Sequence, residues 1–176
     1  MKLLFIGVIL ILIITIILAI LIMNYNDYQV TIIKISEACE NIKLLLTKKM
    51  ELLVMIRNII EDKNKNIKFS DFDITNKKMN SFELNKELNR FNKKVTEIVE
   101  YSKDVKLDDD EKNIINDLKK INIELEGNER YYNDNVVIYN KLIKCFPSNI
   151  VGKICKYKVK DFYSKEKEEI FEILKK

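Results

Sequence analysis

The chain begins with a long apolar stretch that contains no charged residue. Residues 3–23 read LLFIGVILILIITIILAILIM. At ~1.5 Å per residue, a helix of this length spans about 31 Å, which matches the roughly 30 Å hydrocarbon core of a bilayer. Most positions are Leu, Ile, Val or Phe, and each favours insertion by roughly 0.3–0.6 kcal/mol at the helix centre. The stretch predicts a transmembrane anchor through residues 3–23 after a short flank, residues 1–2.

A cleaved secretory signal is the alternative interpretation of this stretch. Such a signal has a shorter apolar core, about 7–15 residues, and a small-x-small cleavage site. The chain has neither feature, and Tyr25 and Tyr28 follow the stretch where an interfacial aromatic belt would lie. We therefore favour an uncleaved anchor. Lys2 precedes it and the next basic residue is Lys34, so the positive-inside rule places the rest of the chain on the extracytoplasmic side of the cell membrane.

The composition favours helices over sheets. The chain has 3 Gly and 1 Pro against 47% hydrophobic and 33% charged residues, so it lacks the turn residues of a many-stranded sheet. Its net charge is +4, but no basic stripe with interleaved aromatic residues emerges, and we expect no nucleic-acid partner. The fold class expected is all-α: a single N-terminal transmembrane helix, then an antiparallel bundle of three to four long helices over 24–163, then a charged C-terminal helix or tail over 164–176.

Hydrophobic periodicity places the first helices. Apolar residues recur at alternating steps of three and four from Ile35 to Ile59, with one break at Lys49. Neither Pro nor Gly lies between Met23 and Asp62, so this helix can continue the anchor. The polar stretch Glu61–Asp73 predicts a loop, and a second helix is expected over Asn76–Tyr101.

A third helix follows four consecutive acidic residues, 108–111. Their spacing lacks the alternate ligands and central Gly of a calcium loop, so we interpret them as a cap for the helix N-terminus. The apolar repeat continues to Phe146, and Pro147 ends the helix. Gly127 in its interior predicts a kink or a close helix contact.

Two Tyr-Asn pairs lie seven residues apart in the third helix, Tyr132-Asn133 and Tyr139-Asn140. Seven residues make almost two turns, so both tyrosines share one face and both asparagines lie beside it. We interpret this face as a packing seam in which the amides fix the register. A ligand site on the same face is the alternative.

The stretch ERYYNDNVVIYNKLIKCFPSNIVGKICKYKVKDFY, Glu129–Tyr163, resembles the C-terminal signature of the LemA family, an R-x-YN-x5-YN pattern followed by an FPSNIVA-like motif and an aromatic segment. Leu46–Ile56, LTKKMELLVMI, is similar to the LKRRADLIPNLV helix of that family, although Val54 and Met55 replace its Pro-Asn. The resemblance implies an anchored, largely antiparallel helical bundle without an established activity. The motif positions, expected to be structural, are Tyr132, Asn133, Tyr139, Asn140, Phe146, Pro147 and Asn149.

The residue inventory offers little for catalysis. The chain has no histidine, which removes Ser-His-Asp and Cys-His triads and most zinc sites, and glycines only at 7, 127 and 152, which removes a phosphate loop. We predict no catalytic residue, metal ligand or cofactor. Cys39, Cys145 and Cys155 are expected to be buried free thiols, and a Cys145–Cys155 disulfide is the alternative.

These observations predict a membrane-anchored, non-catalytic protein that serves as a scaffold or docking module at the bacterial cell envelope. Its expected partners are the lipid bilayer, unidentified membrane or envelope proteins, and a second copy of itself. The alternatives are a small-ligand sensor, or a hydrolytic or redox enzyme that uses the Tyr/Asn face of the third helix.

Overall fold

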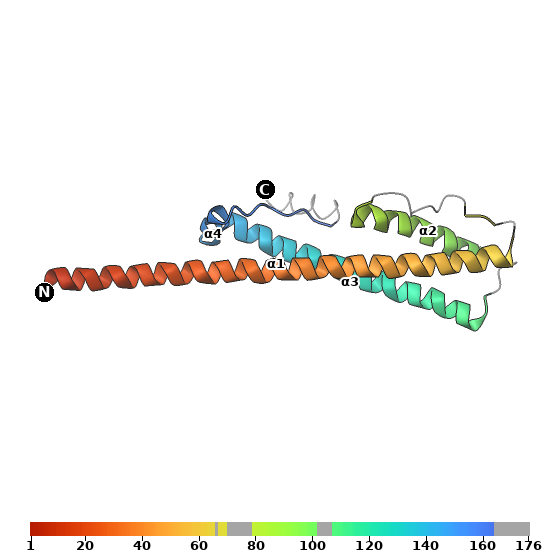
Figure 1. The fold of residues 1–176 in the computed structure, drawn as a ribbon, viewed down its shortest axis with the longest axis horizontal. Helices are drawn as coiled ribbons and strands as arrows, with labels where there is room; N and C mark the ends of the chain where they lie inside the picture. Colours follow the sequence, from red (N-terminus) through yellow and green to blue (C-terminus); the bar gives the residue numbers. More distant parts are fainter. Residues whose placement is uncertain (66, 70–78, 102–106, 164–176) are drawn as a thin grey trace. The chain divides into compact units, whose positions relative to one another are not determined.

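The computed structural model describes residues 1–65, 67–69, 79–101 and 107–163. Four α-helices make up most of this part of the chain, which contains no strand: α1 (Lys2–Lys63), α2 (Ser81–Tyr101), α3 (Asp109–Lys144) and α4 (Ser148–Ile154) (Figure 1). The all-α expectation is confirmed. The charged helix or tail expected over 164–176 lies outside the described residues.

The chain forms two compact units. Unit 1 consists of Met1–Glu37 and Tyr131–Lys176, and unit 2 of Ala38–Arg130. Helices α1 and α3 each contribute one part to unit 1 and the other part to unit 2.

Helix α1 continues from the apolar stretch without a break, as the absence of Pro and Gly predicted. Its end, however, lies beyond the predicted loop start at Glu61. Ile60 is fully buried, and the Lys63 Nζ lies 2.6 Å from the Glu111 Oε2 of α3. These two interactions hold the last turn in helical form, so the helix ends at Lys63.

In unit 2, α1 and α2 run in the same direction, and α3 runs against both. Lys49 of α1 contacts Asn89, in the middle of α2. Fourteen residues further along α1, Lys63 contacts Glu111, which follows the end of α2 in the sequence and lies in the first turn of α3. The expected antiparallel pairing therefore holds for α3 but not for the α1–α2 pair. A parallel pair needs a connection that returns along the bundle, and Phe69 in that connection packs edge-on against Phe91, with ring centroids 5.1 Å apart.

Reciprocal hydrogen bonds cap two helices. The Glu111 N–H donates to Asp108 Oδ1 and the Asp108 N–H to Glu111 Oε2, both at 2.8 Å, which confirms the capping interpretation of the acidic run. Asn80 and Glu83 form the same arrangement at the start of α2. Helix α2 thus begins at Ser81, later than the predicted Asn76, since Asn80 serves as its N-cap. Residues 76–78 lie outside the described residues.

The core of unit 2 is built from the predicted apolar faces. Its buried apolar residues are Ala38, Ile42, Leu45, Leu46, Leu53, Ile56, Ile60, Leu88, Phe91, Val95, Leu118 and Leu125. Gly127 is exposed, and a Cβ added there would meet nothing within 4 Å, so the close helix contact expected at this glycine is wrong.

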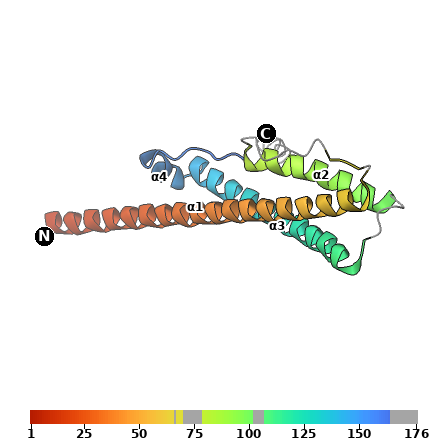
Figure 2. The same ribbon diagram turned by 45° about the vertical axis from the view of Figure 1, so that its right-hand side comes forward.

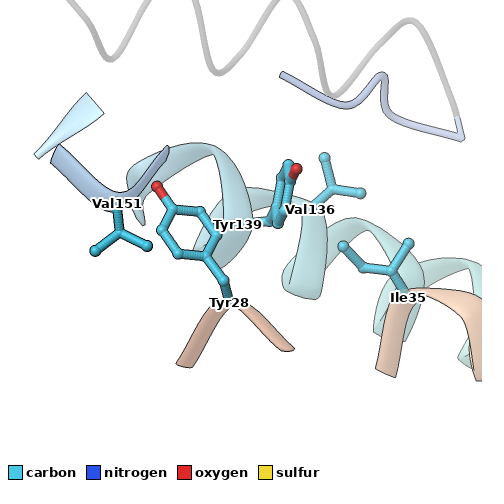
Figure 3. Close-up of a cluster of buried hydrophobic side chains, with 5 residues drawn as sticks. All are labelled: Tyr28, Ile35, Val136, Tyr139 and Val151. Atoms are coloured by element: carbon cyan, nitrogen blue, oxygen red, sulfur yellow. The ribbon is translucent and has the colours of Figure 1, made fainter. Parts of the chain in front are cut away.

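The core of unit 1 lies where α4 and the second half of α3 pack on α1. It consists of Tyr28, Ile35, Val136, Tyr139 and Val151 (Figure 3). In Figures 1 and 2, α4 lies beside α1, at the C-terminal end of α3.

The third helix ends earlier than predicted. Helix α3 stops at Lys144, and Phe146, expected on its apolar face, is 79% exposed. Pro147 takes the N-cap position of α4, which is consistent with the bias of the residue before a proline against helical geometry.

Candidate functional site

The asparagines of the two Tyr-Asn pairs bind the backbone of the chain's own C-terminal segment, residues 157–163. The side chain of Asn140 does so twice: its Nδ2 donates to the Lys160 carbonyl and its Oδ1 accepts the Lys160 N–H, both at 2.9 Å. Asn133 Oδ1 accepts the Tyr163 N–H at 2.8 Å. Both asparagines are buried. An extended segment that lies along a helix has no strand beside it to bind its backbone groups. The two side-chain amides supply hydrogen bonds that this backbone would otherwise lack.

The tyrosines of the same pairs have different environments. Tyr139 is buried against Tyr28, with ring centroids 5.8 Å apart and planes at 82°, while Tyr132 is half-buried and packs near Tyr163. The Tyr132 hydroxyl donates to the Asp161 carbonyl at 3.3 Å. One Tyr-Asn pair thus packs into the core, and the other holds the far end of the 157–163 segment.

Tyr28 lies at the centre of unit 1 and is fully buried. Its hydroxyl donates to the Ser148 carbonyl at 3.3 Å, and its ring also lies 4.9 Å from that of Tyr157 (Figure 3 shows its approach to Val151). Burial, with a smaller contribution from Tyr139, raises the pKa of Tyr28 to about 12. This tyrosine is therefore protonated at neutral pH and acts as a packing and hydrogen-bonding group.

The FPSN motif forms the turn from α3 into α4. Ser148 Oγ lies within hydrogen-bond distance of the Leu142 and Cys145 carbonyls, at 2.7 and 2.9 Å, at the end of α3 where carbonyls lack helical partners. Pro147 is half-buried, and Asn149 Oδ1 is buried without a hydrogen-bond partner. Phe146 extends into solvent. The motif thus combines a structural turn with one exposed aromatic ring.

A buried polar cluster in unit 2 was not predicted. Lys49, interpreted above as a break in the apolar repeat, is 1% exposed, and its Nζ donates to Asn89 Oδ1 at 2.6 Å. Nearby, Asn85 Nδ2 donates to Glu129 Oε1 at 2.6 Å. Burial lowers the pKa of Lys49 to about 8, and the charge of Glu129 opposes this shift. The position of Lys49 in the sequence was the available signal for its burial. It lies four residues after Leu45 and four before Leu53, on the same face of α1 as these two buried residues.

The three cysteines are free thiols in the structure. The expectation that all are buried is wrong, because Cys145 is exposed and Cys39 and Cys155 are half-buried. Cys145 lies in the turn after α3, where the chain leaves the core.

No group of acidic or cysteine side chains in the described residues is arranged to hold a metal ion. The described residues of unit 2 form open surface grooves. One is lined by Arg57, Glu61, Lys65, Ile67, Lys68 and Phe69, and another by Lys48, Glu51, Leu52, Met55, Asp117, Lys120, Ile121 and Glu124. Neither groove contains a residue of the Tyr-Asn or FPSN motifs.

The family model described as LemA family matches residues 38–173, which include both Tyr-Asn pairs, the FPSN turn and the 157–163 segment. The chain belongs to the LemA family. Comparison with curated proteins and with solved structures gives no match. In this LemA-family chain, the amides of Asn133 and Asn140 hold the C-terminal segment, and the aromatic rings close the end of unit 1.

Proposed function

We propose that this LemA-family chain is a single-pass membrane protein whose helical body is a non-catalytic docking module for other proteins of the bacterial cell envelope. The observation that carries the proposal is the continuity of α1. One helix leads from an apolar span, none of it buried within the structure, into a body with its own core. Such a span needs lipid around it.

Exposed apolar side chains support the docking role. Leu44 and Met55 on the unit 2 half of α1 are 54% and 51% exposed. They lie eleven residues apart, which is about three turns, so they share one face of the helix, opposite the buried residues Ile42 and Leu53. No described residue of the chain covers these two side chains, and we take them as two points of the protein contact surface.

The geometry argues against a catalytic or ligand-binding use of the Tyr/Asn face. A ligand site there requires free amide groups, but both polar atoms of the Asn140 amide bind Lys160, and Asn133 Oδ1 binds the Tyr163 N–H. A sensor or an enzyme on this face would first have to release the 157–163 segment. We therefore prefer the docking module.

Photo-crosslinking in native membranes tests the proposal. A photoreactive residue is placed at Leu44 or at Met55. The control position is Lys43, which is also exposed but points to a different face of the same helix, about 100° from Leu44. We expect discrete protein adducts from Leu44 and Met55 and weaker ones from Lys43. Adducts with the mass of two copies identify self-association, and larger or mixed masses identify envelope partners. Equal or absent adducts at all three positions contradict the docking role.

The side of the membrane has a separate test. The positive-inside rule, applied to Lys2, places the body on the extracytoplasmic side. Protease added to cells with a permeabilised outer layer should then digest the body, while a cytoplasmic control protein stays intact. Protection of the body until the cell membrane is lysed contradicts this orientation.

A further inference from the structure

The turn from α3 into α4 and the residues after it form a surface that the other described residues of unit 1 do not cover. This α3–α4 corner comprises residues 144–160. Phe146 is 79% exposed, Ile154 68% and Val159 58%, and Ile150 is exposed as well. Helix α4 buries Ser148, Val151 and Gly152 against the core, so Ile150 and Ile154, four residues apart, lie on its other side. Four exposed apolar side chains within fourteen residues are unusual for a solvent-facing corner.

The same corner is strongly basic. Residues 144–160 contain no Asp or Glu and five lysines, namely Lys144, Lys153, Lys156, Lys158 and Lys160. Lys153, Lys156 and Lys158 are exposed. Apolar side chains interleaved with lysines are typical of segments that lie in the headgroup layer of an anionic bilayer.

The corner lies close to the apolar span. Leu21, in the last turn of that span, packs against the core cluster of unit 1, and the Tyr28 hydroxyl binds the Ser148 carbonyl at the start of α4. Gln29 Nε2 donates to the Tyr157 hydroxyl at 2.8 Å. At ~1.5 Å per residue, Tyr28 is about 7.5 Å beyond Met23 along α1. The headgroup layer on each side of a bilayer is about 5–8 Å thick.

We propose that the α3–α4 corner rests on the bilayer surface, with Phe146, Ile150 and Ile154 in the interfacial layer and the lysines against anionic lipid headgroups. The inference rests on the proposed function, because it takes residues 3–23 to be inserted in lipid. The occupant is the lipid surface, since the charge of the corner complements anionic headgroups and Leu21 connects the corner's core to the span itself. The corner would then be a second contact with the bilayer, in addition to the span of residues 3–23. Two contacts fix the tilt of unit 1 relative to the membrane.

The chain contains no tryptophan, so single-tryptophan variants report on one position each. The full chain is reconstituted into vesicles of phosphatidylcholine with phosphatidylglycerol and with lipids brominated at defined depths. Three variants are compared: Ile13→Trp in the span, Phe146→Trp in the corner, and Ile138→Trp, which is exposed on α3 within the same unit. Circular dichroism confirms that each variant is folded.

We expect bromolipids to quench Ile13→Trp and Phe146→Trp, with the shallow bromine positions most effective for Phe146→Trp, and its emission to shift to the blue. Ile138→Trp should remain unquenched. If Ile13→Trp is quenched and Phe146→Trp is not, the corner proposal is overturned while the anchor stands, whether water or a second copy of the chain covers that side chain. If Ile13→Trp is also unquenched, the anchor itself has failed.

The lysines are tested in the Phe146→Trp background. Lys153→Glu with Lys156→Glu should reduce the quenching of the Phe146→Trp variant. The same two substitutions in the Ile13→Trp variant should leave its quenching unchanged. The control, Lys86→Glu with Lys93→Glu on α2, alters net charge equally at two exposed positions and should have no effect. Replacing phosphatidylglycerol by phosphatidylcholine should act like the corner variants. Quenching that is insensitive to both changes overturns the anionic-lipid contact.

Discussion

Gly152 leaves the space that the Tyr28 hydroxyl occupies: a Cβ built on Gly152 would lie 2.6 Å from Tyr28 Oη and 3.4 Å from Cζ. Tyr28 is fully buried and also packs against Tyr139, so its ring has little room to retreat. The contact between α4 and α1 therefore depends on a glycine at position 152. Apart from Tyr28, the nearest atom to the added Cβ is the Ile143 Cα at 3.8 Å, which is an ordinary contact distance.

Gly152→Ala should destabilise the protein by about 1–3 kcal/mol, as overpacking in a core does. Tyr28→Phe removes the atom that clashes and should recover much of this loss in the double variant. Thermal unfolding of the single and double variants in detergent micelles measures the coupling. Additive losses would show that the two residues do not compete for the same space.

Gly127→Ala is the matched opposite case. A Cβ added at Gly127 meets nothing within 4 Å, and the residue lies inside α3, where alanine has the higher helix propensity. We expect a gain of up to about 1 kcal/mol in the free energy of unfolding. A loss of stability at this position would indicate a contact that the structure does not contain.

Asn140→Ala should release part of the 157–163 segment. The Lys160 amide loses its acceptor, so its hydrogen exchange should accelerate, while the Tyr163 amide, bound to Asn133, should keep more of its protection. Asn135→Ala is the control, because Asn135 is also buried on α3 but its Nδ2 donates to the Tyr131 carbonyl of its own helix. Equal exchange at Lys160 in both variants would contradict the role of Asn140.

Lys49→Met should raise stability at pH 7, because an apolar side chain of similar length removes a buried charge, and Asn89 is exposed and can bind water instead. The folded pKa of Lys49, about 8, lies below the ordinary lysine value of 10.5. Between these values the unfolded chain binds more protons, so this lysine costs less stability as pH rises. The advantage of Lys49→Met should therefore shrink from pH 7 towards pH 9.5.

The upper limit of that pH range avoids Tyr28. Its pKa of about 12 exceeds the ordinary value of 10.0, so above pH 10 the unfolded chain loses this proton first and stability falls for a different reason. Lys48→Met, at the exposed neighbouring position, is the control for a change in net charge. A constant difference between the Lys49 variant and the parent protein across the range would contradict a depressed pKa.

The sequence predicted the parts of the fold that depend on local periodicity. Most of the apolar repeat that begins at Ile35 is buried as expected, although Leu52 and Ile59 are only half-buried. Asp108 and Glu111 cap α3 as their charge and position indicated. Periodicity could not predict that α2 runs parallel to α1, since an apolar face has no direction along the chain. The long polar stretch before α2 was the available signal, because a parallel neighbour requires a connection as long as the helix itself.

The candidate site shows the same limit. Spacing placed Asn133 and Asn140 on one side of a helix, but their partners are backbone groups of Lys160 and Tyr163, in a segment whose extended path no periodic pattern marks. Lys49 was misread for a related reason. A lysine in an apolar repeat resembles an interruption, and only the packing of three helices shows that its side chain is buried.

The fate of the apolar stretch in cell membranes is the most direct test of this account. Membranes are washed with alkaline carbonate, and the intact mass of the chain is measured in the pellet and the supernatant. A chain anchored through residues 3–23 stays in the pellet with its complete mass of 20.9 kDa. Release into the supernatant, or a mass that lacks residues 1–23, would contradict a continuous helix anchored in lipid.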